Sequence, residues 1–137
     1  MVESFMILGL VLVDLLLQLR YCMIFKSVGV EILPGLHEIA MNAREKYIEI
    51  CLNNTTEIEF VCGSMFNTRC SSGQAVDWTD GDVVYANSTC YDDDMMAELS
   101  AIGANMRPGS YFITLSRTLQ ESDGFRVLEE RRYEMSW

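Results

Sequence analysis

Residues 26 to 38 read KSVGVEILPGLHE, and this stretch decides the class of fold. Residues 27 to 33 are rich in β-branched side chains and stop at Pro34, which predicts a β-strand. The apolar residues that follow have helical spacing and predict an amphipathic helix of about four to five turns. A strand that carries Glu31 near its end and leads straight into a helix is typical of an α/β unit. The predicted apolar face of the helix consists of Leu36, Ile39, Ala40, Ala43, Tyr47, Ile50 and Cys51.

The rest of the chain continues the same alternation. Residues 57–62 (EIEFVC) and 82–87 (DVVYAN) are predicted strands, separated by a loop over residues 67–81 that is rich in Ser, Gly, Thr and Asp. Residues 92–106 are a predicted helix with an acidic first turn, and residues 110–116 are a further strand.

The order of these elements indicates the architecture. Strand, helix, strand, loop, strand, helix and strand together predict an α/β fold with a Rossmann-like open, mostly parallel sheet and crossover helices. Residues 125–137 (FRVLEERRYEMSW) are expected to add one or two edge strands. At 137 residues the chain is expected to form a single domain over residues 1–137.

Composition excludes several classes of function. The formal net charge is -10, which argues against direct binding to nucleic acid phosphates because such binding needs Lys and Arg. The five cysteines form no CxxC pair and their number is odd, which favours reduced thiols in an intracellular protein. His37 is the only histidine, so neither a metal site nor a His-based catalytic triad is expected.

Residues 5–19 (FMILGLVLVDLLLQL) are the one stretch that could belong to a membrane. The stretch is interrupted by Asp14, follows Glu3 rather than a basic segment, and is shorter than the roughly 20 apolar residues of a membrane span. We therefore expect a buried core element and no membrane partner. The alternative of a small membrane-anchored or secreted protein stays open, in which case the glycosylation motifs at Asn53, Asn54 and Asn87 would matter.

Polar residues follow the ends of the predicted strands, where an open α/β sheet binds its ligand. Glu31 has the position of an acid that accepts hydrogen bonds from ribose hydroxyls, although it could simply cap the next helix or be solvated at the strand end. Ser64 could lie against a base or in an ordinary turn. Asn87 could meet a ligand or bond its own backbone, and Tyr91 follows on the same segment. We expect these four side chains to converge on a nucleoside pocket.

Three segments carry a resemblance to a known family. SVGVEILPGLHEIA, DVVYANSTCYDDDMMAEL and NMRPGSYFITLS, in that order, resemble class I S-adenosylmethionine-dependent methyltransferases. More narrowly they resemble the Dot1 family of histone lysine methyltransferases, over about residues 22–137. The resemblance implies a Rossmann-like fold, S-adenosylmethionine as the cofactor, and transfer of a methyl group to a lysine amine.

The resemblance also assigns roles to residues of this sequence. It implies that Glu31, Ser64 and Asn87 bind the cofactor, and that Asn87 and Tyr91 line the site of methyl transfer. Gly9 falls where the family has its glycine loop, about 20 residues before the acid. The implied reaction is attack of an amine nitrogen on a sulfonium methyl group, which depends mainly on positioning and on desolvation of a deprotonated amine.

The glycine loop departs from the family pattern. The family has Asp-x-Gly-x-Gly-x-Gly, whereas residues 7–13 (ILGLVLV) keep Gly9 alone. The loss of two or three backbone hydrogen bonds removes roughly 3 to 5 kcal/mol, or about two to four decades of cofactor affinity. The family's amino-terminal helical lobe is also missing. We therefore expect a domain truncated at its amino terminus, which is either an impaired enzyme or a chain whose true beginning lies upstream.

The resemblance implies a partner and a location as well. The partner would be a basic protein substrate, a histone or nucleosome, and the protein would be a nuclear chromatin regulator. An acidic surface suits such a substrate. A catalytically inactive methyltransferase-like module that serves protein interactions is the alternative, and the degraded glycine loop is the feature that favours it.

Overall fold

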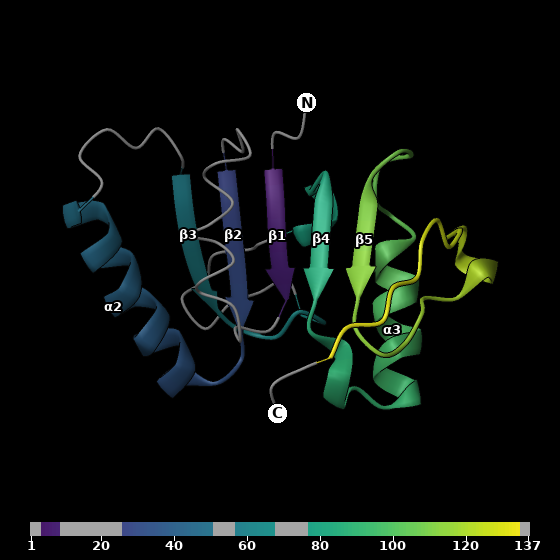
Figure 1. Ribbon diagram of the computed structural model, residues 1–137, viewed down its shortest axis with the longest axis horizontal. Helices are drawn as coiled ribbons and strands as arrows, with labels where there is room; N and C mark the ends of the chain where they lie inside the picture. The colour runs from purple at the N-terminus through teal and green to yellow at the C-terminus, as the bar shows by residue number, and fades with distance from the viewer. Residues whose placement is uncertain (1–3, 9–25, 51–56, 68–76, 135–137) are drawn as a thin grey trace.

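One parallel sheet organises the molecule (Figure 1). The computed structural model describes residues 4–8, 26–50, 57–67 and 77–134. Within these ranges five strands form a sheet in the order β3-β2-β1-β4-β5, and every neighbouring pair is parallel. The strands are β1 (Ser4–Leu8), β2 (Lys26–Glu31), β3 (Glu57–Cys62), β4 (Val83–Ala86) and β5 (Tyr111–Thr114). The predicted Rossmann-like parallel sheet is therefore confirmed.

The strand order creates a switch point beside β1. The chain steps from β1 outward to β2 and β3, and then returns to the other side of β1 to form β4 and β5. Leu8 at the end of β1 aligns with Val30 of β2 and with Ala86 of β4. Because all strands are parallel, their carboxyl ends share one edge, which is the lower edge in Figure 1. A switch in strand order is where open α/β sheets bind ligands.

Helices flank the two ends of this sheet. Helix α2 (Pro34–Ile50) lies beside β3, and helix α3 (Asp93–Gly103) lies beside β5 (Figure 1). The guanidinium Nε of Arg44 ties α2 to β3 by donating to the Ile58 carbonyl at 2.6 Å. Asp92 caps α3 by accepting the Met95 N–H at 2.8 Å, and two acids in the first turn suit the positive end of the helix dipole.

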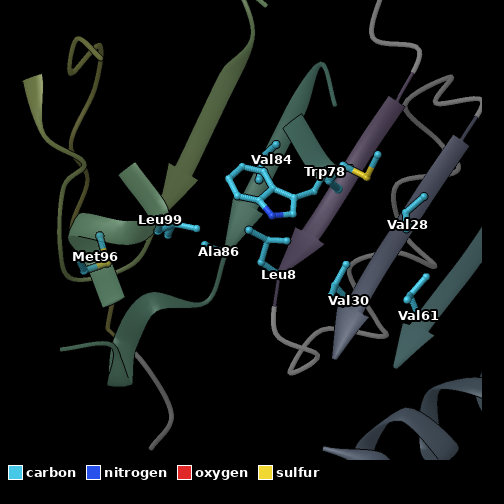
Figure 2. Close-up of a cluster of buried hydrophobic side chains, with 10 residues drawn as sticks. Leu8, Val28, Val30, Val61, Trp78, Val84, Ala86, Met96 and Leu99 are labelled. Carbon is cyan, nitrogen blue, oxygen red and sulfur yellow. The ribbon is translucent and has the colours of Figure 1, made fainter. Parts of the chain in front are cut away.

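The main core runs along one face of the sheet, from β3 to β4, and continues to α3, and Figure 2 shows its side chains. Trp78 is its largest member and is 1% exposed. It belongs to a short 3-10 helix, Trp78–Asp80, just before β4, and its ring meets Phe112 of β5 edge to face at 5.9 Å between centroids. The residues of this core are Met6, Leu8, Val28, Val30, Val61, Trp78, Val84, Ala86, Met96 and Leu99.

The predicted edge strands after residue 125 are wrong for the described part of that segment. Residues 125–134 contain no strand. The ring of Phe125 lies edge-on to that of Phe112, with 5.9 Å between centroids, while Val127 and Leu128 are 51% and 63% exposed. An alternating pattern cannot hold a strand here because little beyond Phe125 is buried. β5 is thus the edge of the described sheet.

The predicted apolar face of α2 is also largely wrong. The structure buries only Ala40 and Tyr47 of this helix, and Ile39 and Ile50 are 60% and 80% exposed. Ala40 and Tyr47 are seven positions apart, about two helical turns, so they define a narrow stripe against the sheet. The sheet therefore covers less of the helix than the sequence predicted, and apolar side chains of the wider stripe are exposed on the surface.

The apolar segment 5–19 begins as the central strand of the sheet. β1 ends at Leu8, which is fully buried, so this part of the segment is the expected core element. The remainder of the segment, including Gly9, and the motifs at Asn53 and Asn54 lie outside the described residues. Among the helices that the structure does describe, none combines the length and the apolar character needed to span a bilayer.

Candidate functional site

The end of β2 places a buried carboxylate at the ligand-binding edge. Glu31 is only 5% exposed, and its Oε1 accepts the Leu33 N–H at 2.7 Å. This bond turns the chain out of the strand, so the strand ends at Glu31 and not at Leu33 as predicted, and Leu33 is exposed. The capping interpretation of Glu31 is therefore correct in part. A carboxylate this deeply buried is nevertheless costly unless several donors reach it, which is typical of a functional position.

The turn after β3 lies next to this carboxylate. The Gly63 N–H donates to the Glu31 carbonyl at 2.8 Å. Ser64 is half-buried; its Oγ accepts the Phe66 N–H at 3.2 Å and its carbonyl accepts the Asn67 N–H at 3.2 Å. Ser64 thus helps to form a turn, as the alternative prediction of an ordinary turn expected. The hydrogen bond from Gly63 also holds this turn beside β2, so Ser64 lies at the same edge as Glu31.

The residues after β4 approach the same edge from the other side of β1. The Asn87 N–H donates to the Leu8 carbonyl at 3.1 Å, which places Asn87 at the switch point. Its side chain forms no cap; Oδ1 accepts the Thr89 hydroxyl at 3.1 Å. Ser88 is fully buried and bonds both backbone groups of Leu115, at 2.6 and 2.9 Å. Ser88 therefore joins the ends of β4 and β5, a structural role.

Tyr91 connects the β4 side of the site with the β3 side. Its hydroxyl lies 3.4 Å from Met65 Sδ, and its half-buried ring packs against the main core. Burial raises the pKa of Tyr91 to about 12, with further contributions from the charge of Glu31 and from Tyr85. Tyr91 is thus within electrostatic range of Glu31, and its hydroxyl stays protonated near neutral pH.

The structure therefore places four predicted residues along one edge and leaves the fifth undescribed. Glu31 and Ser64 are joined through Gly63, Tyr91 reaches the turn after β3, and Asn87 sits at the end of β4. Gly9 lies outside the described residues. The roles of these side chains in binding and catalysis stay predictions.

Met65, in the turn after β3, and Trp78, the core residue bonded to it, are two residues that the sequence did not indicate. The Trp78 Nε1–H donates to the Met65 carbonyl at 2.7 Å, and the Met65 sulfur meets the Tyr91 hydroxyl. The sequence signal for such a contact is the tryptophan itself, because a buried indole N–H needs a hydrogen-bond acceptor. The sequence showed Trp78 only as part of a polar loop, so its partner could not be named.

The donor set of the edge suits the polar groups of an organic ligand. A buried carboxylate, a hydroxyl, an amide and a phenol are groups that bind the hydroxyls and polar edges of a nucleoside. Among the residues that the structure describes, no group of three His, Cys, Asp or Glu side chains could hold a metal ion.

Comparisons with known proteins support the fold. No protein-family model and no curated protein matches the chain. DesVI of Streptomyces venezuelae is 13% identical with a TM-score of 0.51, and the match covers 82% of this chain and 42% of that one. SAM-bound CalS10 is an amino pentose methyltransferase from Micromonospora echinaspora involved in calicheamicin biosynthesis. It is 14% identical with a TM-score of 0.52, covering 88% of this chain and 45% of that one.

This chain spans less than half the length of either structure. At such low identity the likeness bears on the arrangement of strands and helices. The five parallel strands with flanking helices are the arrangement that the chain shares with these proteins. The chain therefore has the Rossmann-like fold that the methyltransferase CalS10 also has.

Proposed function

We propose that this chain binds S-adenosylmethionine across the carboxyl ends of its strands and belongs to an enzyme that methylates an amine. One observation carries the proposal: the buried Glu31 carboxylate lies at the ligand edge of the sheet, within electrostatic range of Tyr91. The SAM-bound state of CalS10, a structure with the same fold, supports this choice of cofactor.

Each end of the cofactor has a matching group in this chain. Glu31 accepts hydrogen bonds from the two ribose hydroxyls, which offset the cost of burying its charge. Ser64 and Met65 follow Gly63, whose N–H donates to the Glu31 carbonyl, and they hold the base. Asn87, next to the end of β1, binds the methionine end or the incoming amine through its amide.

The reaction requires little acid-base chemistry from the protein. S-Adenosylmethionine, when bound, supplies an electrophilic methyl group and a leaving group that departs neutral. Tyr91 cannot serve as the base near neutral pH, because a group with a pKa of about 12 seldom gives up its proton there. In this proposal the amine loses its proton on entry, and the chain contributes positioning and a low-dielectric site.

The proposed acceptor is the amine of a protein lysine, as in Dot1-type enzymes. The sequence resemblance of three segments supports it, and the net charge of -10 favours a basic partner such as a histone. A nuclear location follows from that target. CalS10 is described as an amino pentose methyltransferase, so a small amino sugar is the competing acceptor, and an amine is common to both.

A melting experiment tests cofactor binding. S-Adenosylhomocysteine at about 100 times its dissociation constant adds ~2.7 kcal/mol to stability, which should raise Tm by several degrees. Glu31→Gln should abolish most of the rise, whereas Glu38→Gln, on the exposed surface of α2, should keep it. An unchanged Tm for the wild-type chain at millimolar ligand would favour the inactive interaction module instead.

A labelling experiment tests the acceptor. The chain is incubated with methyl-labelled S-adenosylmethionine and either nucleosomes or a mixture of amino sugars. Label on histone lysine supports the Dot1-type proposal. Label on the sugars alone would replace it with small-molecule methylation, and binding without any label would indicate that this chain is not sufficient for catalysis.

A further inference from the structure

Trp78 lies where the main core meets the turn that lines the proposed nucleoside site. The side chain is 1% exposed and sits beside Leu8 and Val84 (Figure 2). Its ring is anchored by Phe112, edge-on at 5.9 Å. A tryptophan so enclosed has little freedom, so whatever its indole N–H binds is held to the core.

The acceptor of that N–H is a residue of the turn after β3. Trp78 Nε1 lies 2.7 Å from the Met65 carbonyl, a short hydrogen bond between groups 13 positions apart in sequence. The Tyr91 hydroxyl contacts the same residue at the Met65 sulfur, with 3.4 Å between the oxygen and the sulfur. The bond from Trp78 is made to a backbone atom, so it acts directly on the path of the chain, whereas the contact of Tyr91 is made to a side chain.

The local bonds of the turn do not fix its position by themselves. The Ser64 hydroxyl and carbonyl bond to Phe66 and Asn67, which closes the turn on itself. Gly63 joins its start to the Glu31 carbonyl at 2.8 Å. The bond from the buried indole to the Met65 carbonyl is a further tie on this turn, and it joins the turn to the core rather than to β2.

We propose that Trp78 is a positioning residue for nucleoside binding: its indole N–H holds the Met65 carbonyl and so presents the Ser64 turn to the base. This inference rests on the proposed function. It deepens that function by assigning base recognition to a side chain that never touches the ligand. Without the bond the turn must be ordered at the moment of binding, which lowers affinity.

The test removes the N–H without changing the shape of the side chain. Replacing Trp78 by benzothienylalanine, in which sulfur takes the place of the indole nitrogen, keeps the packing and deletes the donor. Affinity for S-adenosylhomocysteine, measured by calorimetry, should fall about fivefold to tenfold. Affinity for S-ribosylhomocysteine, which has the ribose and no base, should change less than twofold. Trp78→Phe also removes the indole N–H, so it should likewise lower the affinity for S-adenosylhomocysteine.

A matched control separates positioning from stability. Leu99→Ala removes a fully buried core side chain of α3 and leaves both the Phe112 ring and the Trp78 hydrogen bond in place, so it should lower Tm while keeping the affinity for S-adenosylhomocysteine. In the ligand-free protein, the amides of Phe66 and Asn67 should exchange with deuterium faster in the benzothienylalanine protein and not in Leu99→Ala.

The outcomes distinguish this inference from the proposed function. If wild type binds S-adenosylhomocysteine and the benzothienylalanine protein binds it equally well, Trp78 has no positioning role and the proposed function stands. Equal losses for both ligands would also overturn the inference, because they would indicate a general structural effect. If wild type binds neither ligand, the proposed function fails. Independently of ligand binding, if the amides of the turn exchange at the same rate in wild type and in the benzothienylalanine protein, Trp78 does not hold the turn.

Discussion

Replacing Tyr91 by phenylalanine should make the protein lose less stability in alkali. The folded structure raises the pKa of Tyr91 from 10.0 to about 12. A folded pKa above the unfolded value means that the contribution of Tyr91 is fully present below pH 10.0 and is lost as the pH rises through about 12. Two pKa units correspond to ~2.7 kcal/mol, and partial exposure of the ring reduces this to about 1 to 2 kcal/mol.

Urea unfolding at two pH values measures this difference. The free energy of unfolding of wild type and of Tyr91→Phe should be compared at about pH 9 and about pH 11.5, on either side of the unfolded pKa. Wild type should lose about 1 to 2 kcal/mol more than the variant over this interval. Tyr133→Phe is the matched control, because Tyr133 is 71% exposed, and it should behave like wild type.

The same titration tests the geometry of the site. The charge of Glu31 is the second cause of the raised pKa of Tyr91, after burial. Glu31→Gln should therefore lower the pKa of Tyr91, which the absorbance of tyrosinate records as the difference between each protein and its Tyr91→Phe partner. Equal alkaline losses in wild type and Tyr91→Phe, or a Tyr91 pKa indifferent to Glu31→Gln, would refute the placement of Tyr91 at the Glu31 edge.

Three further substitutions test the fold. Leu99→Ala, at a fully buried position of α3, should cost about 2 to 5 kcal/mol in urea unfolding, whereas Leu128→Ala, 63% exposed, should cost under about 0.5 kcal/mol. Ser88→Ala deletes two hydrogen bonds between the ends of β4 and β5 and should cost about 1 to 3 kcal/mol; an unaltered midpoint would contradict that tie. Arg107→Ala breaks an exposed ion pair with Asp82 and should cost under ~1 kcal/mol, with the cost shrinking in high salt.

Local patterns predicted most of the elements that position the site. The strand predicted at residues 57–62 is β3 with the same bounds, and the helix predicted at residues 92–106 is α3 with its ends shortened to Asp93–Gly103. Glu31 was predicted at a strand end, and it ends β2. These predictions succeed because strand alternation, helix caps and turn residues are properties of neighbouring residues.

Predictions that depended on packing were less successful. The apolar stripe of α2 was predicted too wide, because the sequence cannot say how much of a stripe the sheet will cover. The strands expected after residue 125 do not form in residues 125–134, where Phe125 packs beside Phe112 and most other side chains remain exposed. Alternating apolar and polar residues are compatible with a strand, but they do not supply the packing surface or the neighbouring strand that it needs.

The sequence by itself determined the alternation of strands and helices, and with it a parallel sheet whose strand ends carry Glu31 and Asn87. Only the tertiary structure decided which residues meet at that edge. Tyr91 and Met65 are 26 positions apart, and Trp78 and Met65 are 13 apart, yet hydrogen bonds join both pairs. No local periodicity encodes such contacts, because they arise when the crossover connections bring β3 and β4 to opposite sides of β1.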